Sequence, residues 1–206
     1  KVTLLTGDNF GNIRALGTVS LQTGARAKNI QSIGDITLSG NSKADNLETM
    51  GNVTLSWASV KDVKANGWVS MNTSAKAGKI ESSKDVTLWT GSQAQDIYAK
   101  NEVELHTNTS ANNIKAGGNV LITGAGARAK NIESRETVEV SIAGAKAENI
   151  YANKVVLGIS GSAKDVYSAT TVVNSVGGTT SVSGRADSIT RNSDEAKAKM
   201  RQKSRN

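Results

Sequence analysis

Proline and cysteine are both absent from this chain of 206 residues, and aromatic residues make up only 3% of it. Without cysteine, the chain can form neither disulfides nor thiolate metal sites. The absence of proline leaves every backbone N–H available to a β-ladder, which proline would interrupt. Because large aromatic side chains are scarce, we expect a narrow core lined by short aliphatic residues instead of a large globular core.

A repeat of about seventeen residues recurs about ten times, which is the signature of a solenoid. Each repeat contains three short pairs of apolar or small residues, spaced two apart. In the second repeat the pairs are Val19 with Leu21, Ala25 with Ala27, and Ile30 with Ser32. Alternate residues of a strand face the same side. Each pair should therefore belong to a short strand of its own and point inward, so that each coil has a triangular cross-section and the coils stack into three parallel sheets.

These patterns predict an all-β fold, a right-handed, single-stranded parallel β-helix of about ten coils. A left-handed helix built on hexapeptides would need one inward residue every six positions, whereas the inward residues here fall at uneven offsets. The period shortens between Leu47 and Val63 and lengthens between Ile114 and Ile132. Such changes should fall in turns, because a one-residue shift inside a strand exchanges its two faces.

We expect one β-helical domain over residues 1–185, followed by a polar tail over 186–206. In the tail, Ser193 could cap a short helix. Solenoids need capped ends, and Lys1 leads directly into the strand pattern, so the chain reads as a segment of a longer protein. No apolar run is long enough to span a membrane, and no signal-like segment opens the chain.

The formal net charge of +7 raises the question of an anionic partner. The segment from Ser193 onward holds +3 of this charge. In the rest of the chain the two signs interleave along the sequence. Nucleic acid is therefore not an expected partner.

A column of Asn and Asp directly precedes the aliphatic residue of the third inward pair. Its members are Asn12, Asn29, Asn46, Asp62, Asp96, Asn113, Asn131, Asn149 and Asp165. Their oxygens could ligate a row of cations, but the carboxylates are scattered along the column. We expect a structural role instead, with each residue in a left-handed turn conformation and its amide stacked on those of neighbouring coils. No metal or cofactor is expected.

Catalysis is not expected either. Sugar-cleaving β-helices need carboxylates gathered in a cleft, and no outward column concentrates Asp or Glu. His106 is the only histidine and has no cysteine or second histidine with which to bind a metal. The three tryptophans, Trp57, Trp68 and Trp89, fall within about three coils and form a candidate surface-binding patch. Packing of Trp57 in a corner of the coil is the alternative.

The segments "IKAGGNVLITGAGARAKNIESRETVEV" and "LETMGNVTLSWASVKDVKANGWVSM" resemble the shaft repeats of filamentous haemagglutinin and related two-partner-secreted exoproteins. The resemblance covers residues 1–170. It implies a rigid shaft of a secreted bacterial surface adhesin or a contact-dependent toxin-delivery exoprotein. The implied partners are an outer-membrane transporter and, through the larger protein, a receptor on a host or bacterial cell surface.

The phrases "KNIQS", "KDVKA", "QDIYA" and "KDVYS" are also similar to the repeats of bactofilins, which are cytoplasmic polymer-forming β-helices. This second resemblance implies a cytoskeletal protein that assembles end to end through its terminal coils. The sequence leaves both alternatives open.

Overall fold

A computed structural model describes residues 1–142, 144–174 and 185–191. It contains two compact units, Lys1–Lys100 and Asn101–Asn206, and each is described by itself below. Both units are parallel β-solenoids, and together they hold about ten turns of about seventeen residues. The predicted fold class is therefore confirmed.

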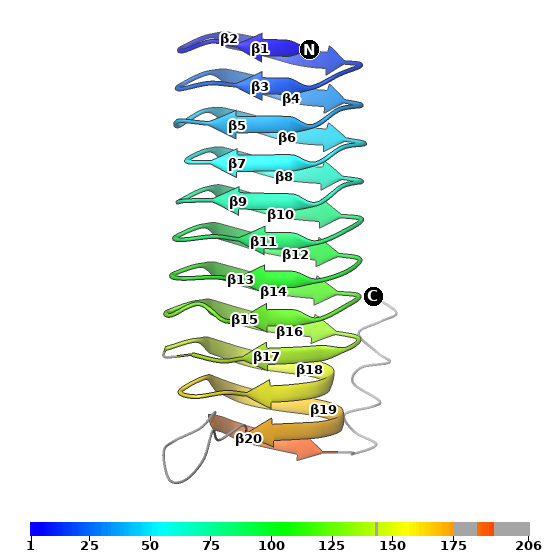
Figure 1. Ribbon diagram of the computed structural model, residues 1–206, viewed down its shortest axis with the longest axis vertical. Coiled ribbons are helices and arrows are strands. Elements are labelled where there is room, and N and C mark those ends of the chain that lie inside the picture. The colour runs from blue at the N-terminus through cyan, green and yellow to red at the C-terminus, as the bar shows by residue number, and fades with distance from the viewer. Residues whose placement is uncertain (143, 175–184, 192–206) are drawn as a thin grey trace. The chain divides into compact units, whose positions relative to one another are not determined.

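Unit 1 alternates short and long strands, and each kind forms its own parallel ladder (Figure 1). The short strands are β1 (Val2–Leu4), β3 (Val19–Leu21), β5 (Ile36–Ser39), β7 (Val53–Ser56), β9 (Val69–Asn72) and β11 (Val86–Leu88). The long strands are β2 (Asn9–Ala15), β4 (Arg26–Ser32), β6 (Lys43–Thr49), β8 (Ser59–Ala65), β10 (Lys76–Ser82) and β12 (Gln93–Ala99).

Unit 2 continues the same alternation and then joins the two kinds of strand. Its separate strands are β13 (Val103–Leu105), β14 (Ser110–Ala116), β15 (Val120–Ile122), β16 (Arg128–Ser134) and β17 (Thr137–Val140). The joined strands β18 (Lys146–Leu157) and β19 (Ser162–Asn174) each pair along both ladders, and β20 (Arg185–Arg191) pairs with β19. The long-strand ladder thus includes residues 186–191, which the sequence analysis assigned to the tail. The predicted helix after Ser193 lies outside the described residues.

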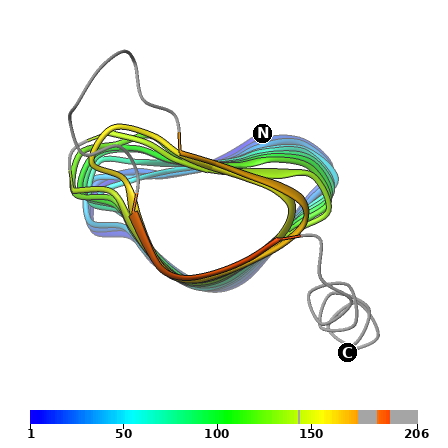
Figure 2. The same ribbon diagram turned by 90° about the horizontal axis from the view of Figure 1, so that it is seen from below.

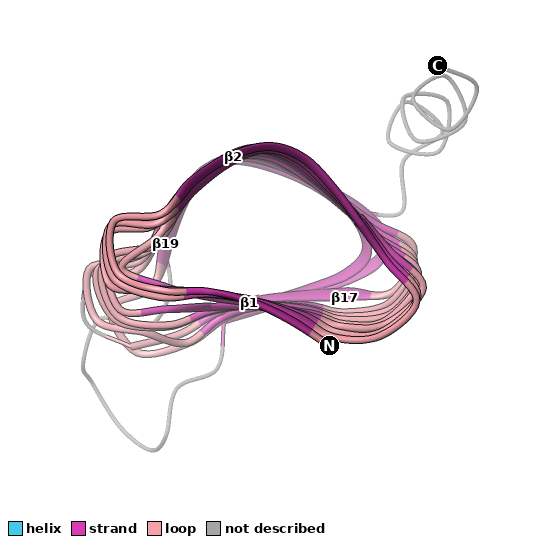
Figure 3. Ribbon diagram, turned by 90° about the horizontal axis from the view of Figure 1, so that it is seen from above, coloured by secondary structure: helices cyan, strands magenta, loops and turns pink. Residues whose placement is uncertain are grey.

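The coil of unit 1 is right-handed. Seen from above in Figure 3, the chain runs clockwise from the N-terminus through β1 and β2, and Figure 1 shows that it descends as it turns. This is the handedness expected of parallel crossovers.

Each complete coil of unit 1 has two strands, although its cross-section has three inward-facing pairs. The long strand begins within the second pair and contains the whole of the third, and Figures 2 and 3 show it bent opposite the short strand. In β4 the bend falls where two successive residues, Lys28 and Asn29, face outward between the buried Ala27 and Ile30. The expectation of a separate strand for each pair is therefore wrong, because the corner lies inside a continuous ladder.

The core is a narrow stack of aliphatic residues. Leu21, Ile30 and Leu38 have no exposed surface, and burial of each such side chain stabilises the fold by roughly 1.5–3 kcal/mol. The tight part of the cross-section is filled by Ala25, which is also fully buried. Small and large residues thus occupy fixed columns, so every coil fills the same cross-section.

Changes in the length of the repeat fall in turns, as predicted. The turn between β7 and β8 has two residues, whereas the turn between β5 and β6 has three. In unit 2, the period between Val103 and Val120 is followed by a longer one between Ala111 and Ala129, which places the additional residue between β15 and β16. The inward and outward faces of the strands are therefore preserved.

Candidate functional site

The Asn column of unit 1 forms a hydrogen-bonded ladder along the solenoid. Nδ2 of Asn29 donates to Oδ1 of Asn12 at 2.8 Å, and Nδ2 of Asn46 donates to Oδ1 of Asn29 at 2.6 Å. Each amide donates toward the preceding coil and accepts from the following one. Asp62 comes next and has no amide proton to donate, so the pattern cannot continue through it.

Unit 2 repeats the arrangement. Asn131 donates to Asn113 and Asn149 donates to Asn131, both at 2.8 Å from Nδ2 to Oδ1. Asp165 then follows Asn149 in register. The Asn members therefore act on one another across neighbouring coils.

These residues do not adopt the left-handed conformation that the sequence suggested. They lie in extended long strands, and the described residues with positive φ lie mainly in the turn between the short and long strands. These turn residues include Gly24 with a φ of 71°, Asn41 with 64° and Trp57 with 48°. The expectation is wrong because the corner at Asn29 is formed by a bend in a strand, whereas the reversal that needs left-handed residues is elsewhere.

Lys79 is the cation that interrupts the column, between Asp62 and Asp96 in register. Its ammonium group forms an ion pair with Glu81 and lies 5.3 Å from the centre of the Tyr98 ring. The hydrogen bond to Glu81 and the attraction of that carboxylate raise the pKa of Lys79. This cluster is exposed, and its charges are largely satisfied within the protein.

The tryptophans do not form one patch. Trp68 directly precedes the short strand β9, whereas Trp57 and Trp89 directly follow the short strands β7 and β11. At about 3.3 Å per residue, the length of a short strand separates Trp68 from the other two. All three are exposed, by 55%, 40% and 43% for Trp57, Trp68 and Trp89. Trp57 is therefore not packed within the corner.

Trp57 lies in a turn that is unfavourable for a bulky residue. Its φ of 48° is in the left-handed region, where equivalent turns use Gly24 or Asn41. Its N–H donates to the carbonyl of Thr73, and its carbonyl accepts from the N–H of Asn41, so ladder bonds on both sides hold the turn. An exposed aromatic residue in a strained conformation is a candidate contact residue.

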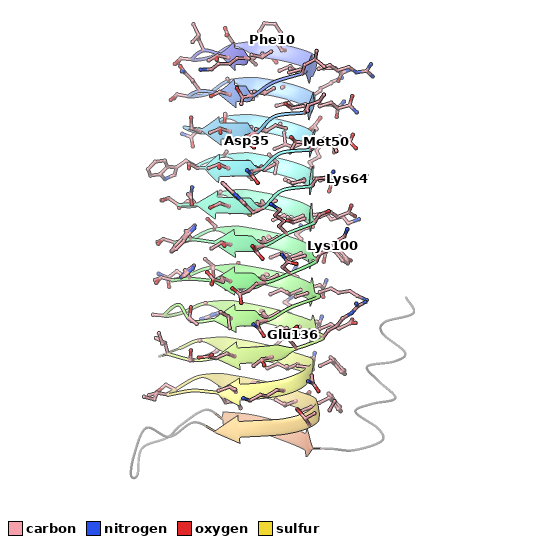
Figure 4. All side chains as sticks on the ribbon, turned by 45° about the vertical axis from the view of Figure 1, so that its right-hand side comes forward. Phe10, Asp35, Met50, Lys64, Lys100 and Glu136 are labelled. Carbon is pink, nitrogen blue, oxygen red and sulfur yellow. The ribbon has the colours of Figure 1, made fainter. Side chains whose placement is uncertain are left out.

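A shallow groove of about 580 Å³ lies along the corner where the chain leaves the long strands of unit 1. One side carries the apolar residues Leu16, Ile33 and Met50, which are 87%, 57% and 63% exposed. The other side includes Glu48 and Lys64, which form an ion pair of 3.7 Å. Figure 4 shows Met50 and Lys64 projecting outward from their coils.

Basic residues are concentrated on a second surface, which we call the basic strip. It consists of the outward residues on either side of the first inward residue of each long strand. Its basic members in unit 1 are Arg26, Lys28, Lys43, Lys61 and Lys76, and its one acidic member is Asp45. Five basic residues against one acidic residue give the strip of unit 1 a net charge of +4.

Unit 2 has a strip of its own at the same positions of the repeat, and it forms a groove of about 570 Å³. It contains Arg128, Lys130, Lys146 and Lys164 against one acidic residue, Glu148, which is a net charge of +3. Its floor is formed by alanines, of which Ala129 and Ala147 are paired in register. The expectation that the two signs interleave is therefore wrong in space, although it describes the order along the chain.

Outside the strip, acidic residues outnumber basic residues in unit 1 and in residues 101–174 of unit 2. The other charged residues of unit 1 are six basic and seven acidic, and those of residues 101–174 in unit 2 are three basic and six acidic. Sequence reasoning missed this segregation because strip residues of neighbouring coils are about seventeen positions apart. Sorting the charges by their offset within the repeat would have found it.

Two acidic residues of unit 2 lie on the opposite surface, which the short strands form. Glu104 and Glu139 belong to one outward column, and Nε2 of His106 lies 3.2 Å from Oε2 of Glu104. No group of three His, Asp or Glu side chains suited to a metal occurs among the described residues. The two grooves contain one carboxylate each, Glu48 and Glu148, whereas glycoside hydrolysis uses a pair.

In the described part of the chain, no helix is long and apolar enough to cross a membrane. No family model, curated protein or solved structure matches this chain.

Proposed function

We propose that this chain is a non-enzymatic, rigid shaft segment of a secreted bacterial surface adhesin or contact-dependent toxin-delivery exoprotein. The observation that carries the proposal is the repetition of one cross-section by in-register ladders. In unit 1, the short and long strands each stack without a change of partner from coil to coil. Such an array extends in one direction and resists bending, because each coil contacts mainly its neighbours.

The side-chain bonds between coils support the same function. Besides the Asn ladder, Oγ of Ser32 donates to the carbonyl of Gly17 at 2.6 Å, and Oγ1 of Thr49 donates to the carbonyl of Gly34 at 2.6 Å. These bonds connect adjacent coils at the corner where the chain leaves the long strand. They allow each coil to act as a template for the next one, so folding during export could proceed coil by coil.

In this proposal, the receptor is on a host or bacterial cell surface and export uses an outer-membrane transporter. The exposed, strained Trp57 and the groove beside Met50 are the surfaces best suited to protein contacts. Both are lateral surfaces of unit 1, which suits a shaft that makes contacts along its length.

A second candidate function is a cytoplasmic, bactofilin-like polymer. It is favoured by two large apolar residues of the first coil, Leu5 and Phe10, which are 59% and 54% exposed. Figure 4 shows Phe10 at this coil. Exposed apolar side chains of this kind form a surface suited to association with another chain.

Negative-stain electron microscopy over a concentration series, together with light scattering, separates the two functions. The shaft proposal expects short single particles with a constant mass. Filaments that lengthen with concentration would overturn it in favour of the polymer.

A matched pair of variants locates any self-association. Phe10→Lys places a charge on the first coil and should abolish end-to-end filaments. Leu16→Lys alters an apolar residue of the lateral corner, so it should leave such filaments intact.

A further inference from the structure

We propose that the basic strip binds a linear acidic polysaccharide that lies along the coil axis of either unit. This inference does not depend on the shaft proposal, because it concerns a lateral surface and not the mechanical role of the fold. It rests on the separation of charge, the shape of the groove and the kinds of side chain in it.

The charges of the strip are available to a ligand. Lys61 forms an ion pair with Asp45, with 2.9 Å between Nζ and Oδ1. Among the described residues, no ion pair involves the other basic members of the strip in either unit. All of them are exposed. An anionic chain would therefore replace counterions and would not have to compete with internal carboxylates.

The spacing of the strip favours a linear polymer. Arg128 and Lys146 are paired in register on adjacent strands, so their backbones are about 4.8 Å apart. The two walls of the groove are two residues apart along one strand, or about 6.6 Å. Between the walls the alanine side chains face inward, so the floor of the groove is strand backbone. The groove runs along the coil axis and thus suits a single extended chain.

Its polar residues favour a polysaccharide over a nucleic acid. The walls include Ser110, Asn112 and Ser162 beside the basic residues, and hydroxyl and amide groups can bond to sugar hydroxyls. The groove has no aromatic residue, whereas proteins that bind single-stranded nucleic acid stack bases on aromatic rings. It also lacks a large apolar residue that could enter a bilayer.

Two variants of the full chain with equal charge test the proposal. The strip variant is Arg26→Gln, Lys28→Gln, Lys43→Gln and Lys76→Gln. The control variant is Arg14→Gln, Lys64→Gln, Lys84→Gln and Lys100→Gln, which removes one Arg and three Lys from outside the strip. All eight residues are exposed, and circular dichroism and melting temperature should confirm that both variants fold.

Binding is measured by calorimetry with dextran sulfate, polygalacturonate and neutral dextran over a series of salt concentrations. The wild type should bind the two acidic polymers and not neutral dextran, with affinity that falls as salt rises. The strip variant loses the site of unit 1 and keeps that of unit 2, so it should bind about half as much acidic polymer per chain, whereas the control should keep the wild-type stoichiometry. Preference for sulfate or carboxylate is read from the two acidic polymers.

Three outcomes would overturn the proposal. Equal weakening in both variants would indicate attraction to net charge alone. Tighter binding to oligothymidylate or duplex DNA than to either acidic polysaccharide would assign the strip to nucleic acid. Binding only to vesicles containing phosphatidylserine would assign it to a membrane surface. None of these outcomes bears on whether the particles polymerise.

Discussion

Asn29 both donates to Asn12 and accepts from Asn46, so its amide connects three successive coils of unit 1. All three side chains lie at the bend of a long strand. The same amide is used twice because its carbonyl and NH₂ ends point toward opposite neighbours. This relationship makes Asn29 the central member of the ladder in unit 1.

Replacement of Asn29 by Ala should therefore loosen three coils together. Two exposed hydrogen bonds are lost, at a combined cost of about 1 kcal/mol. Hydrogen exchange should accelerate at amides of β2, β4 and β6. Lys28→Ala is the control, since it removes an adjacent exposed side chain for which no hydrogen bond is found. Equal exchange in both variants would show that the ladder does not contribute to stability.

The fold could be predicted from sequence because the repeat makes the inward-facing positions easy to recognise. The alternation of Val19 and Leu21 recurs in each coil, and the structure buries both residues. The number of strands could not be read in this way. Two successive outward residues, Lys28 and Asn29, suggest a break, yet the backbone continues to pair through the bend.

The site was harder to predict, because it depends on which residues meet across coils. Arg26 and Lys43 are adjacent in the ladder although seventeen positions separate them. Charges that alternate along the chain can thus collect on one surface. The tryptophans show the reverse case, because Trp57 and Trp68 are close in sequence but lie at opposite ends of the short strands.

Substitution of Gly34 by Ala should destabilise unit 1. An added Cβ would lie 2.8 Å from the backbone N of Thr18 and 2.9 Å from the backbone C of Gly17. Both atoms belong to the neighbouring coil, so relief requires the coils to separate, at a cost of about 1–3 kcal/mol. Urea denaturation checks the change.

Gly11→Ala is the matched control for this prediction. An added Cβ at Gly11 has no atom within 4 Å, and Gly11 lies inside the strand β2. Alanine there should be neutral or slightly stabilising, because it restricts the unfolded chain. A similar loss of stability in both variants would refute close coil contact as the cause.

Substitution of Ser42 by Ala should stabilise the protein by about 1 kcal/mol. Ser42 is fully buried, and its hydroxyl is without a hydrogen-bond partner among the described residues. The equivalent turns of neighbouring coils contain Ala25 and Ala58, both buried. Alanine therefore fits this column and removes the cost of an unsatisfied hydroxyl. The change is measured as a rise in melting temperature.

Ser82→Ala provides the opposite case in the same type of experiment. Oγ of Ser82 donates to the carbonyl of Gly67 at 2.8 Å and accepts from the N–H of Lys84 at 3.0 Å. Its loss should destabilise the protein by about 1–2 kcal/mol. If both serine variants changed stability in the same direction, hydrogen bonding would not explain the difference.

Lys79 should retain its proton to a higher pH than an ordinary lysine. The hydrogen bond to Glu81, followed by the attraction of the Glu81 charge, raises the pKa of Lys79 above its usual 10.5. Because the folded pKa is the higher one, the stabilisation is fully present below the unfolded pKa. It is lost as the pH rises through the folded pKa.

NMR titration of the Lys79 side chain measures this shift, and Glu81→Gln should lower the pKa toward 10.5. An unchanged pKa of Lys79 in the Glu81→Gln variant would mean that Glu81 does not hold the ammonium group in solution.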